Sequence, residues 1–143
     1  MNNKIEKILV PIDGSKNSIR GLEMAISIGM NSGAAITGVY SLGIIPHSEF
    51  QAGGSIKRVL DKEIKKIMIE ATRLATQKGI KFREKIMRGD AGYNIIKLAH
   101  DKKENYDLIV IGSRGRGTIK ELFLGSVSNY VVHSSKIPVL IVK

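Results

Sequence analysis

The sequence predicts a single α/β domain, 1–143, built on an open parallel five-stranded sheet with helices on both faces. Short apolar segments alternate with amphipathic helical patterns along the whole chain. This alternation is typical of right-handed β-α-β crossovers. Four of the segments are continuously apolar or β-branched, as strands buried on both faces of a parallel sheet are. The length of 143 residues fits one ordinary domain.

The predicted strands cover residues 8–12, 34–40, 80–87, 108–111 and 137–142. The third of them alternates between apolar and polar residues, which favours a place nearer the edge of the sheet. Pro138 lies inside the last predicted strand, and the other strands contain no internal proline apart from Pro11.

Four helices are predicted between these strands, over residues 15–31, 55–78, 91–103 and 126–134. The first two carry apolar residues with a period near 3.6 and are followed by Gly33 and Gly79, a residue type that commonly ends helices. Asp90 is a candidate N-cap for the third helix. The stretch 42–54 contains proline and glycine and is predicted to be a long loop.

The composition indicates a soluble globular protein without cysteine chemistry. Hydrophobic residues make up 43% of the chain and charged residues 25%, and there is no cysteine for a disulfide or a thiolate metal site. No apolar run approaches the roughly 18 residues of a membrane span, and the N-terminal residues do not resemble a signal peptide. We therefore expect a cytoplasmic protein that does not enter the membrane.

The net charge of +10 favours an anionic ligand. The basic residues are spread along the chain, without a block of like charges and without the aromatic–basic alternation that stacks single-stranded bases. Nucleic acid is therefore not expected as the main partner.

Candidate ligand residues follow the predicted strands. In an open α/β sheet, ligands bind beyond the carboxyl ends of the strands. Pro11-Ile12-Asp13-Gly14-Ser15 ends the first strand, and Ser41 follows the second. The fourth strand runs into Gly112-Ser113-Arg114-Gly115-Arg116-Gly117-Thr118, where three glycines let backbone N–H groups approach an anion.

A second group of donors is expected at Gly125-Ser126, which opens the last helix. The free N–H groups and the dipole of a helix N-terminus favour an anion. Together with Arg114 and the glycine-rich stretch, these donors predict a two-sided grip on a polyphosphate. It is not a Walker loop, because no lysine stands between Gly117 and Thr118, and a G-x-G-x-x-G fingerprint from Gly115 would need glycine at Lys120.

The glycine spacing and both ends of the chain resemble the ATP-binding branch of the universal stress protein family. Gly112, Gly115 and Gly125-Ser126 match its G-2x-G-9x-G-[S/T] signature. Residues 8–15 are similar to the family's first strand and turn, and residues 125–142 to its last helix and strand. The resemblance implies a Rossmann-like sheet in the order 3-2-1-4-5 and a regulatory stress-response protein that binds nucleotide without rapid turnover.

The resemblance also implies an adenine nucleotide, ATP or AMP, between the first and fourth strands. Asp13 would contact the adenosine and Ser41 the base, while Gly112 and Gly115 would admit the ribose and phosphates. The expected nucleotide-binding residues are Pro11, Ile12, Asp13, Ser15, Ser41, Ile111, Gly112, Arg114, Gly115, Gly125, Ser126, Val127 and Ser128. Three positions depart from the family's usual residues. Ser41 stands where the family usually has an apolar residue, Gly38 where it has leucine, and Tyr40 where it has histidine.

Other interpretations remain for single residues. Asp13 and Ser126 are also candidates for helix N-caps. His47, His100 and His133 lack metal-ligand spacing, so no protein-bound metal or catalytic histidine is expected. An Mg²⁺ or Mn²⁺ ion would arrive with the nucleotide and bridge its phosphates.

Two other functions are weighed against the nucleotide-binding regulator. An ATP-dependent adenylating enzyme on a related scaffold would carry a Ser-Gly-Gly-x-Asp-Ser loop, where this chain has Asp13-Gly14-Ser15-Lys16-Asn17-Ser18. A phosphoacceptor receiver domain would need a pair of acidic residues after the first strand. This chain has one there, Asp13.

The last predicted strand also bears on assembly. By the family order, the apolar segment from Ile137 to Val142 lies at a sheet edge, and an exposed apolar edge tends to pair. We expect a homodimer through this segment, as the resemblance also implies.

Overall fold

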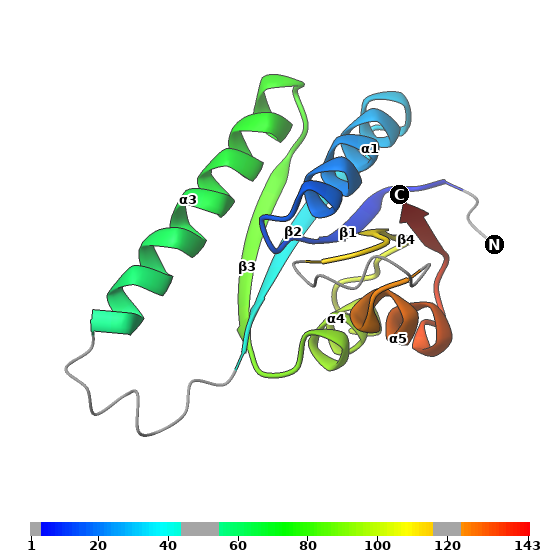
Figure 1. Ribbon diagram of the computed structural model, residues 1–143. Helices are drawn as coiled ribbons and strands as arrows, with labels where there is room; N and C mark the ends of the chain where they lie inside the picture. Colours follow the sequence, from blue (N-terminus) through cyan, green and yellow to red (C-terminus); the bar gives the residue numbers. More distant parts are fainter. Residues whose placement is uncertain (1–3, 44–54, 116–123) are drawn as a thin grey trace.

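The computed structural model describes residues 4–43, 55–115 and 124–143 (Figure 1). Five strands form one parallel sheet in the order β3-β2-β1-β4-β5, which confirms the predicted fold class and strand order. The elements are β1 (Lys7–Pro11), α1 (Lys16–Ser32), β2 (Ala35–Leu42), α3 (Ser55–Gln77), β3 (Phe82–Arg88), α4 (Ala91–Ala99), β4 (Leu108–Gly112), α5 (Ser126–Ser134) and β5 (Val139–Val142).

Two hydrophobic layers enclose the sheet. Ile8 and Val10 of β1 point to the face covered by α1 and α3, whereas Leu9 points to the face covered by α4 and α5. This alternation follows from the two-residue period of a strand. It explains why the central strands are apolar at every position.

The prediction of strands buried on both faces is confirmed for β1, β2 and β4 and is wrong for β5. All four residues of β5 are partly or largely exposed, and Leu140 retains 36% of its accessible surface. The reason is its position at the edge of the sheet, where only β4 pairs with it. Pro138 precedes the strand, and its carbonyl accepts a hydrogen bond from the N–H of Ile109.

The predicted helix ends are confirmed for α1 and α3 and wrong for α4. Gly33 and Gly79 have φ of 79° and 74°, the left-handed conformation that ends helices. The helix capped by Asp90 stops at Ala99, not at residue 103. Asp101 accepts the N–H of Lys103 on its side chain and that of Glu104 on its carbonyl, forming a turn that competes with the helix.

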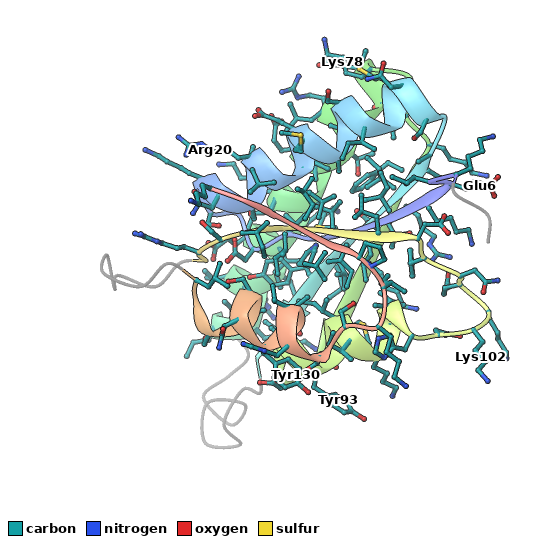
Figure 2. The ribbon with its side chains drawn as sticks, turned by 90° about the vertical axis from the view of Figure 1, so that its right-hand side faces the viewer. Glu6, Arg20, Lys78, Tyr93, Lys102 and Tyr130 are labelled. Atoms are coloured by element: carbon teal, nitrogen blue, oxygen red, sulfur yellow. The ribbon has the colours of Figure 1, made fainter. Side chains whose placement is uncertain are left out.

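Helices α4 and α5 pack closely because Gly92 has no side chain. A Cβ at Gly92 would lie 2.6 Å from Cδ1 of Tyr130. Figure 2 shows Tyr93 and Tyr130 projecting from the outer surface of these two helices. The contact holds the N-terminal ends of α4 and α5 at the same edge of the sheet, where the candidate site lies.

Within the described ranges, no helix has both the length and the hydropathy required to cross a bilayer.

Candidate ligand-binding site

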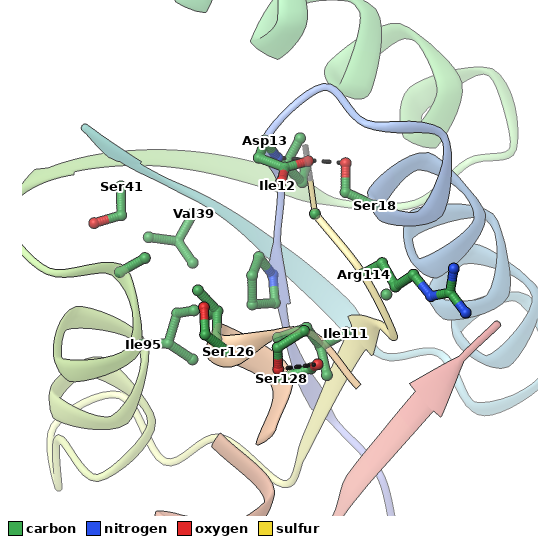
Figure 3. Close-up of a pocket in the computed structure, with 16 residues that line it drawn as sticks. Ile12, Asp13, Ser18, Val39, Ser41, Ile95, Ile111, Arg114, Ser126 and Ser128 are labelled. Atoms are coloured by element: carbon green, nitrogen blue, oxygen red, sulfur yellow. Dashed lines mark hydrogen bonds between the residues drawn. The ribbon is translucent and has the colours of Figure 1, made fainter. Parts of the chain in front are cut away.

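A pocket of about 340 Å³ opens beyond the carboxyl ends of β1, β2 and β4 (Figure 3). Its walls come from segments far apart in the sequence, as expected where the strand order reverses. Of the thirteen expected ligand residues, the twelve that line it are Pro11, Ile12, Asp13, Ser41, Ile111, Gly112, Arg114, Gly115, Gly125, Ser126, Val127 and Ser128.

Four further lining residues were not predicted from the sequence: Ser18, Val39, Ala91 and Ile95. Val39 pairs in register with Pro11, so it lies beside the end of β1 although it sits well inside β2. Two-residue spacing from Ser41 on the same face of the strand is a signal that could have identified it. Ala91 and Ile95 come from the first turns of α4, and only the packing of that helix brings them here.

Asp13 shapes the turn between β1 and α1 rather than capping the helix. Its Oδ1 accepts the N–H of Ser15 at 2.8 Å, and Gly14 has φ of 82°. Ser15 is the N-cap, and its hydroxyl accepts the N–H of Ser18 at 3.2 Å. The alternative of Asp13 as N-cap is therefore wrong, and Ser15 is not among the pocket-lining residues.

The second carboxylate oxygen of Asp13 faces Gly115 across the crevice. A Cβ at Gly115 would lie 2.7 Å from Oδ2 of Asp13. The bare backbone at Gly115 thus leaves room for the carboxylate and for anything bound beside it. This close approach joins the turn after β1 to the turn after β4.

Gly112 has a different environment from Gly115. A Cβ at Gly112 would lie 2.6 Å from the backbone C and O of Asn17 in α1. The residue on the opposite side of this contact is Gly21, where a Cβ would lie 3.3 Å from the N of Gly112. Gly112 lines the pocket, but its lack of a side chain is required by the packing of α1 on β4.

The N-terminus of α5 forms another wall of the pocket. Gly125 is its N-cap, with no side chain to accept a hydrogen bond, and Ser126 is the first helical residue. Ser126 as a helix cap is therefore a wrong alternative. The first N–H groups of a helix have no partner within the helix, and Ser126, Val127 and Ser128 of this first turn line the pocket.

Ser113 ties this helix end to β4. Its carbonyl accepts the N–H of Gly125 at 2.7 Å and the hydroxyl of the buried Ser128 at 2.8 Å. The Ser128 hydroxyl also lies 3.1 Å from the carbonyl of Gly125. Ser128 therefore positions the two halves of the expected phosphate grip.

Arg114 is the basic side chain of the pocket wall in the described part of the chain. It is half-buried, and Figure 3 shows it extending away from Ser41 and Val39 toward α1. The favourable environment for an anion therefore depends mainly on backbone N–H groups. Arg116, Gly117 and Thr118 of the predicted glycine-rich stretch lie outside the described residues, as do residues 44–54 of the predicted loop, with His47.

Ser41 lies in the pocket wall, but its hydroxyl is bonded to the protein. The hydroxyl accepts a hydrogen bond from Nδ2 of Asn94 at 2.8 Å and donates one to the carbonyl of Gly89 at 3.3 Å. Asn94 is buried and also donates to the carbonyl of Arg88. Ser41 thus holds the turn between β3 and α4 against the end of β2.

Replacing Ser41 with alanine is expected to lower the free energy of unfolding by about 1 kcal/mol, because two hydrogen bonds of part-buried groups are lost. Urea denaturation would measure the change. Ser27→Ala, on the exposed face of α1, is the matched control and should stay within about 0.5 kcal/mol of the wild type. Equal stability of the two variants would contradict the structural role of Ser41.

Metal ligands do not cluster in the part of the chain that the structure describes, where no group of three His, Asp or Glu side chains could hold an ion. His100 is the C-cap residue of α4, and its Nε2 accepts the N–H of Lys136 at 3.0 Å. His133 lies in the last turn of α5.

Known proteins match the chain over nearly all of its length. The model of the universal stress protein family matches residues 4–143. A universal stress protein of Methanocaldococcus jannaschii is 31% identical over 99% of this chain and 84% of its own length.

Solved structures share the fold. The universal stress protein UspA of Lactobacillus plantarum superposes with a TM-score of 0.86 at 23% identity, over 99% of this chain and 100% of its own. A universal stress protein in complex with cAMP has a TM-score of 0.73 at 27% identity, over 99% of this chain and 98% of its own. The match of the family model to residues 4–143 and the relative at 31% identity show that the chain belongs to the universal stress protein family.

Proposed function

We propose that this protein binds an adenine nucleotide, ATP or AMP, in the pocket between β1, β4 and the N-terminus of α5. The observation that carries the proposal is that the first turn of α5, which no side chain caps, lines the same pocket as the backbone of Gly115 and the carboxylate of Asp13. Backbone N–H groups donate hydrogen bonds to phosphate oxygens, and a carboxylate accepts hydrogen bonds from ribose hydroxyl groups. Together they match the two polar parts of a nucleotide.

The proposed orientation follows from the distribution of polarity in the pocket. Val39, Ala91 and Ile95 form an apolar wall beyond β2, which suits the faces of a base. The phosphates would lie at the N-terminus of α5. The ribose would lie between the base and the phosphates, and Asp13 would accept hydrogen bonds from its hydroxyl groups. The cAMP complex of the relative at 27% identity supports an adenine nucleotide in this fold.

We propose binding and regulation rather than rapid turnover. Asp13 is the carboxylate of the pocket wall among the described residues, and its Oδ1 is already engaged with the N–H of Ser15. The donors expected at the phosphate end are N–H groups, which do not ligate cations. An Mg²⁺ or Mn²⁺ ion would therefore be held by the phosphates themselves. The bound state would change the contacts that the protein makes with a partner.

Two measurements test the nucleotide proposal. Mass spectrometry of the purified protein after denaturation should release an adenine nucleotide, and calorimetry of the stripped protein should show saturable heat with ATP, AMP or cAMP. Pyrophosphate alone is the control. It should bind more weakly than ATP, because the apolar wall contributes nothing to its binding. Absence of a co-purified nucleotide, together with no heat at millimolar concentrations of all three, would refute the proposal.

We also propose that the protein forms a homodimer through β5. The two edge strands of the sheet differ in composition: β3 has the sequence FREKIMR, with four charged residues, whereas β5 has VLIV. Charged residues on an edge strand prevent pairing with another strand, and an apolar edge favours it. Met24 of α1 is also exposed, on the helix that contacts β5.

Leu140→Lys is expected to convert the dimer to a monomer, because pairing of two β5 strands would bring two ammonium groups into an apolar interface. Sedimentation velocity at micromolar concentration would show the change. Ile86→Lys on β3, which is also largely exposed, is the matched control and should leave the dimer intact. A wild-type protein that sediments as a monomer would contradict the proposed interface.

A further inference from the structure

The outward side of α3 combines exposed aliphatic residues with lysines. Ile64, Met68, Ala71 and Ala75 pack the opposite side of the helix into the core. Val59 and Ile69 face away from it and keep 64% and 59% of their accessible surface. Lys62 and Lys66 lie between them on the same side, since residues three and four apart share a face of a helix. Figure 1 shows α3 on the outer flank of the sheet.

A shallow, open depression lies on this side of the helix. A surface groove of about 430 Å³ is lined by Lys62, Lys65, Lys66, Ile69 and Glu70. We call Val59, Lys62, Lys65, Lys66 and Ile69 together the α3 outer face. Apolar residues at helical spacing are the anchors by which an amphipathic helix docks on a protein surface.

Helix α3 carries six basic residues and three acidic ones, Asp61, Glu63 and Glu70, so its net charge is positive. Glu70, the acidic residue at the groove, is already engaged with Arg73 through two side-chain hydrogen bonds. In the described ranges, Lys62, Lys65 and Lys66 take part in none of the ion pairs. Three ammonium groups therefore face solvent around the two aliphatic residues.

We propose that the α3 outer face is a docking surface for an acidic amphipathic helix of a partner protein. Val59 and Ile69 are ten residues apart, which places them about 15 Å from each other along the helix. A partner helix with two apolar residues at a matching separation and glutamates or aspartates between them satisfies both the anchors and the lysines.

The chemistry of the surface favours this occupant over three others. A second copy of the same face would bring lysines against lysines. A bilayer would require a wide apolar face, and the wide apolar face of α3 is already buried in its own core. Nucleic acid phosphates would use the lysines but leave Val59 and Ile69 without a contact.

The test uses the full-length protein and a fluorescein-labelled synthetic helix of about 22 residues, with leucines about ten residues apart and glutamates between them. Fluorescence anisotropy should show saturable binding at about 100 mM salt, where distant surface charges are screened. A scrambled peptide of the same composition should bind at least about tenfold more weakly.

Matched variants separate the surface from the net charge. Lys62→Glu with Lys66→Glu changes the net charge by −4 and should weaken binding about tenfold or more. Lys97→Glu with Lys103→Glu makes the same change on exposed residues elsewhere and should weaken it less than about threefold. Val59→Ser with Ile69→Ser leaves the charge unchanged and should weaken binding about fivefold. Circular dichroism and thermal melting would establish that each variant is folded.

Three results would overturn the proposal. The first is equal weakening by the two pairs of charge reversals, and the second is equal binding of the scrambled peptide. The third is binding of a DNA duplex or of phosphatidylserine vesicles through Lys62 and Lys66 while the acidic helix does not bind.

Discussion

Gly115→Val is expected to abolish adenine-nucleotide binding while the protein remains folded. The first atom of the new side chain would lie 2.7 Å from Oδ2 of Asp13, so the carboxylate must move away from its position at the crevice. The branched side chain would also fill the space beside the backbone where phosphate or ribose is proposed to lie. Loss of both features predicts an affinity at least about 100-fold lower by calorimetry.

The stability of this variant should change little, because Gly115 is exposed and the predicted clash is with the end of a side chain rather than with backbone. Gly43→Val is the matched control, since a Cβ at Gly43 has no atom within 4 Å and the residue is not part of the pocket wall. It should bind nucleotide as the wild type does. If Gly115→Val bound nucleotide with wild-type affinity, the phosphates would not lie beside Gly115 as proposed.

Residues at strand ends could be predicted from the sequence because local rules place them. A parallel sheet brings the carboxyl ends of its strands to one edge, and the strand order that the family resemblance implies makes the strands of Asp13 and Gly112 neighbours. The left-handed glycines after α1 and α3 are predicted by the same kind of local rule. These features depend on neighbouring residues and on the order of the elements.

Residues that depend on register or on helix packing are not placed by the rule for strand ends. Val39 enters the pocket because β2 extends past it and pairs in register with β1. Ile95 enters because α4 packs against α5 at Gly92 and Tyr130. The choice between Asp13 and Ser15 as N-cap depended on turn geometry, because both residue types cap helices equally well.

The role of Ser41 also became visible only in three dimensions. In the sequence it departs from the apolar residue that the family usually has. In the structure its hydroxyl joins β2 to the turn before α4 through Asn94 and Gly89. Since Asn94 lies 53 positions further along the chain, no local pattern connects the two residues.

Gly112→Ala is expected to have the largest effect on stability. The added Cβ would lie 2.6 Å from the backbone C and O of Asn17, and a Cβ at Gly21 would lie 3.3 Å from the N of Gly112, so α1 and β4 are in close contact on both sides. The backbone of Asn17 is fixed within α1 and cannot rotate away from the new Cβ as a side chain could. Relief of the clash would require α1 to move off the sheet, so we expect about 3 kcal/mol less stability and a melting temperature lower by about 10 °C.

Thermal melting would measure the loss, with Gly43→Ala as a control that should stay within about 0.5 kcal/mol of the wild type. The comparison with Gly115 separates two glycines that stand in one sequence signature. If the packing account is correct, substitution of the first glycine destabilises the fold, and substitution of the second removes the ligand from a stable fold. A Gly112→Ala protein with normal stability and no nucleotide binding would reverse this assignment, because the first glycine would then serve the ligand directly.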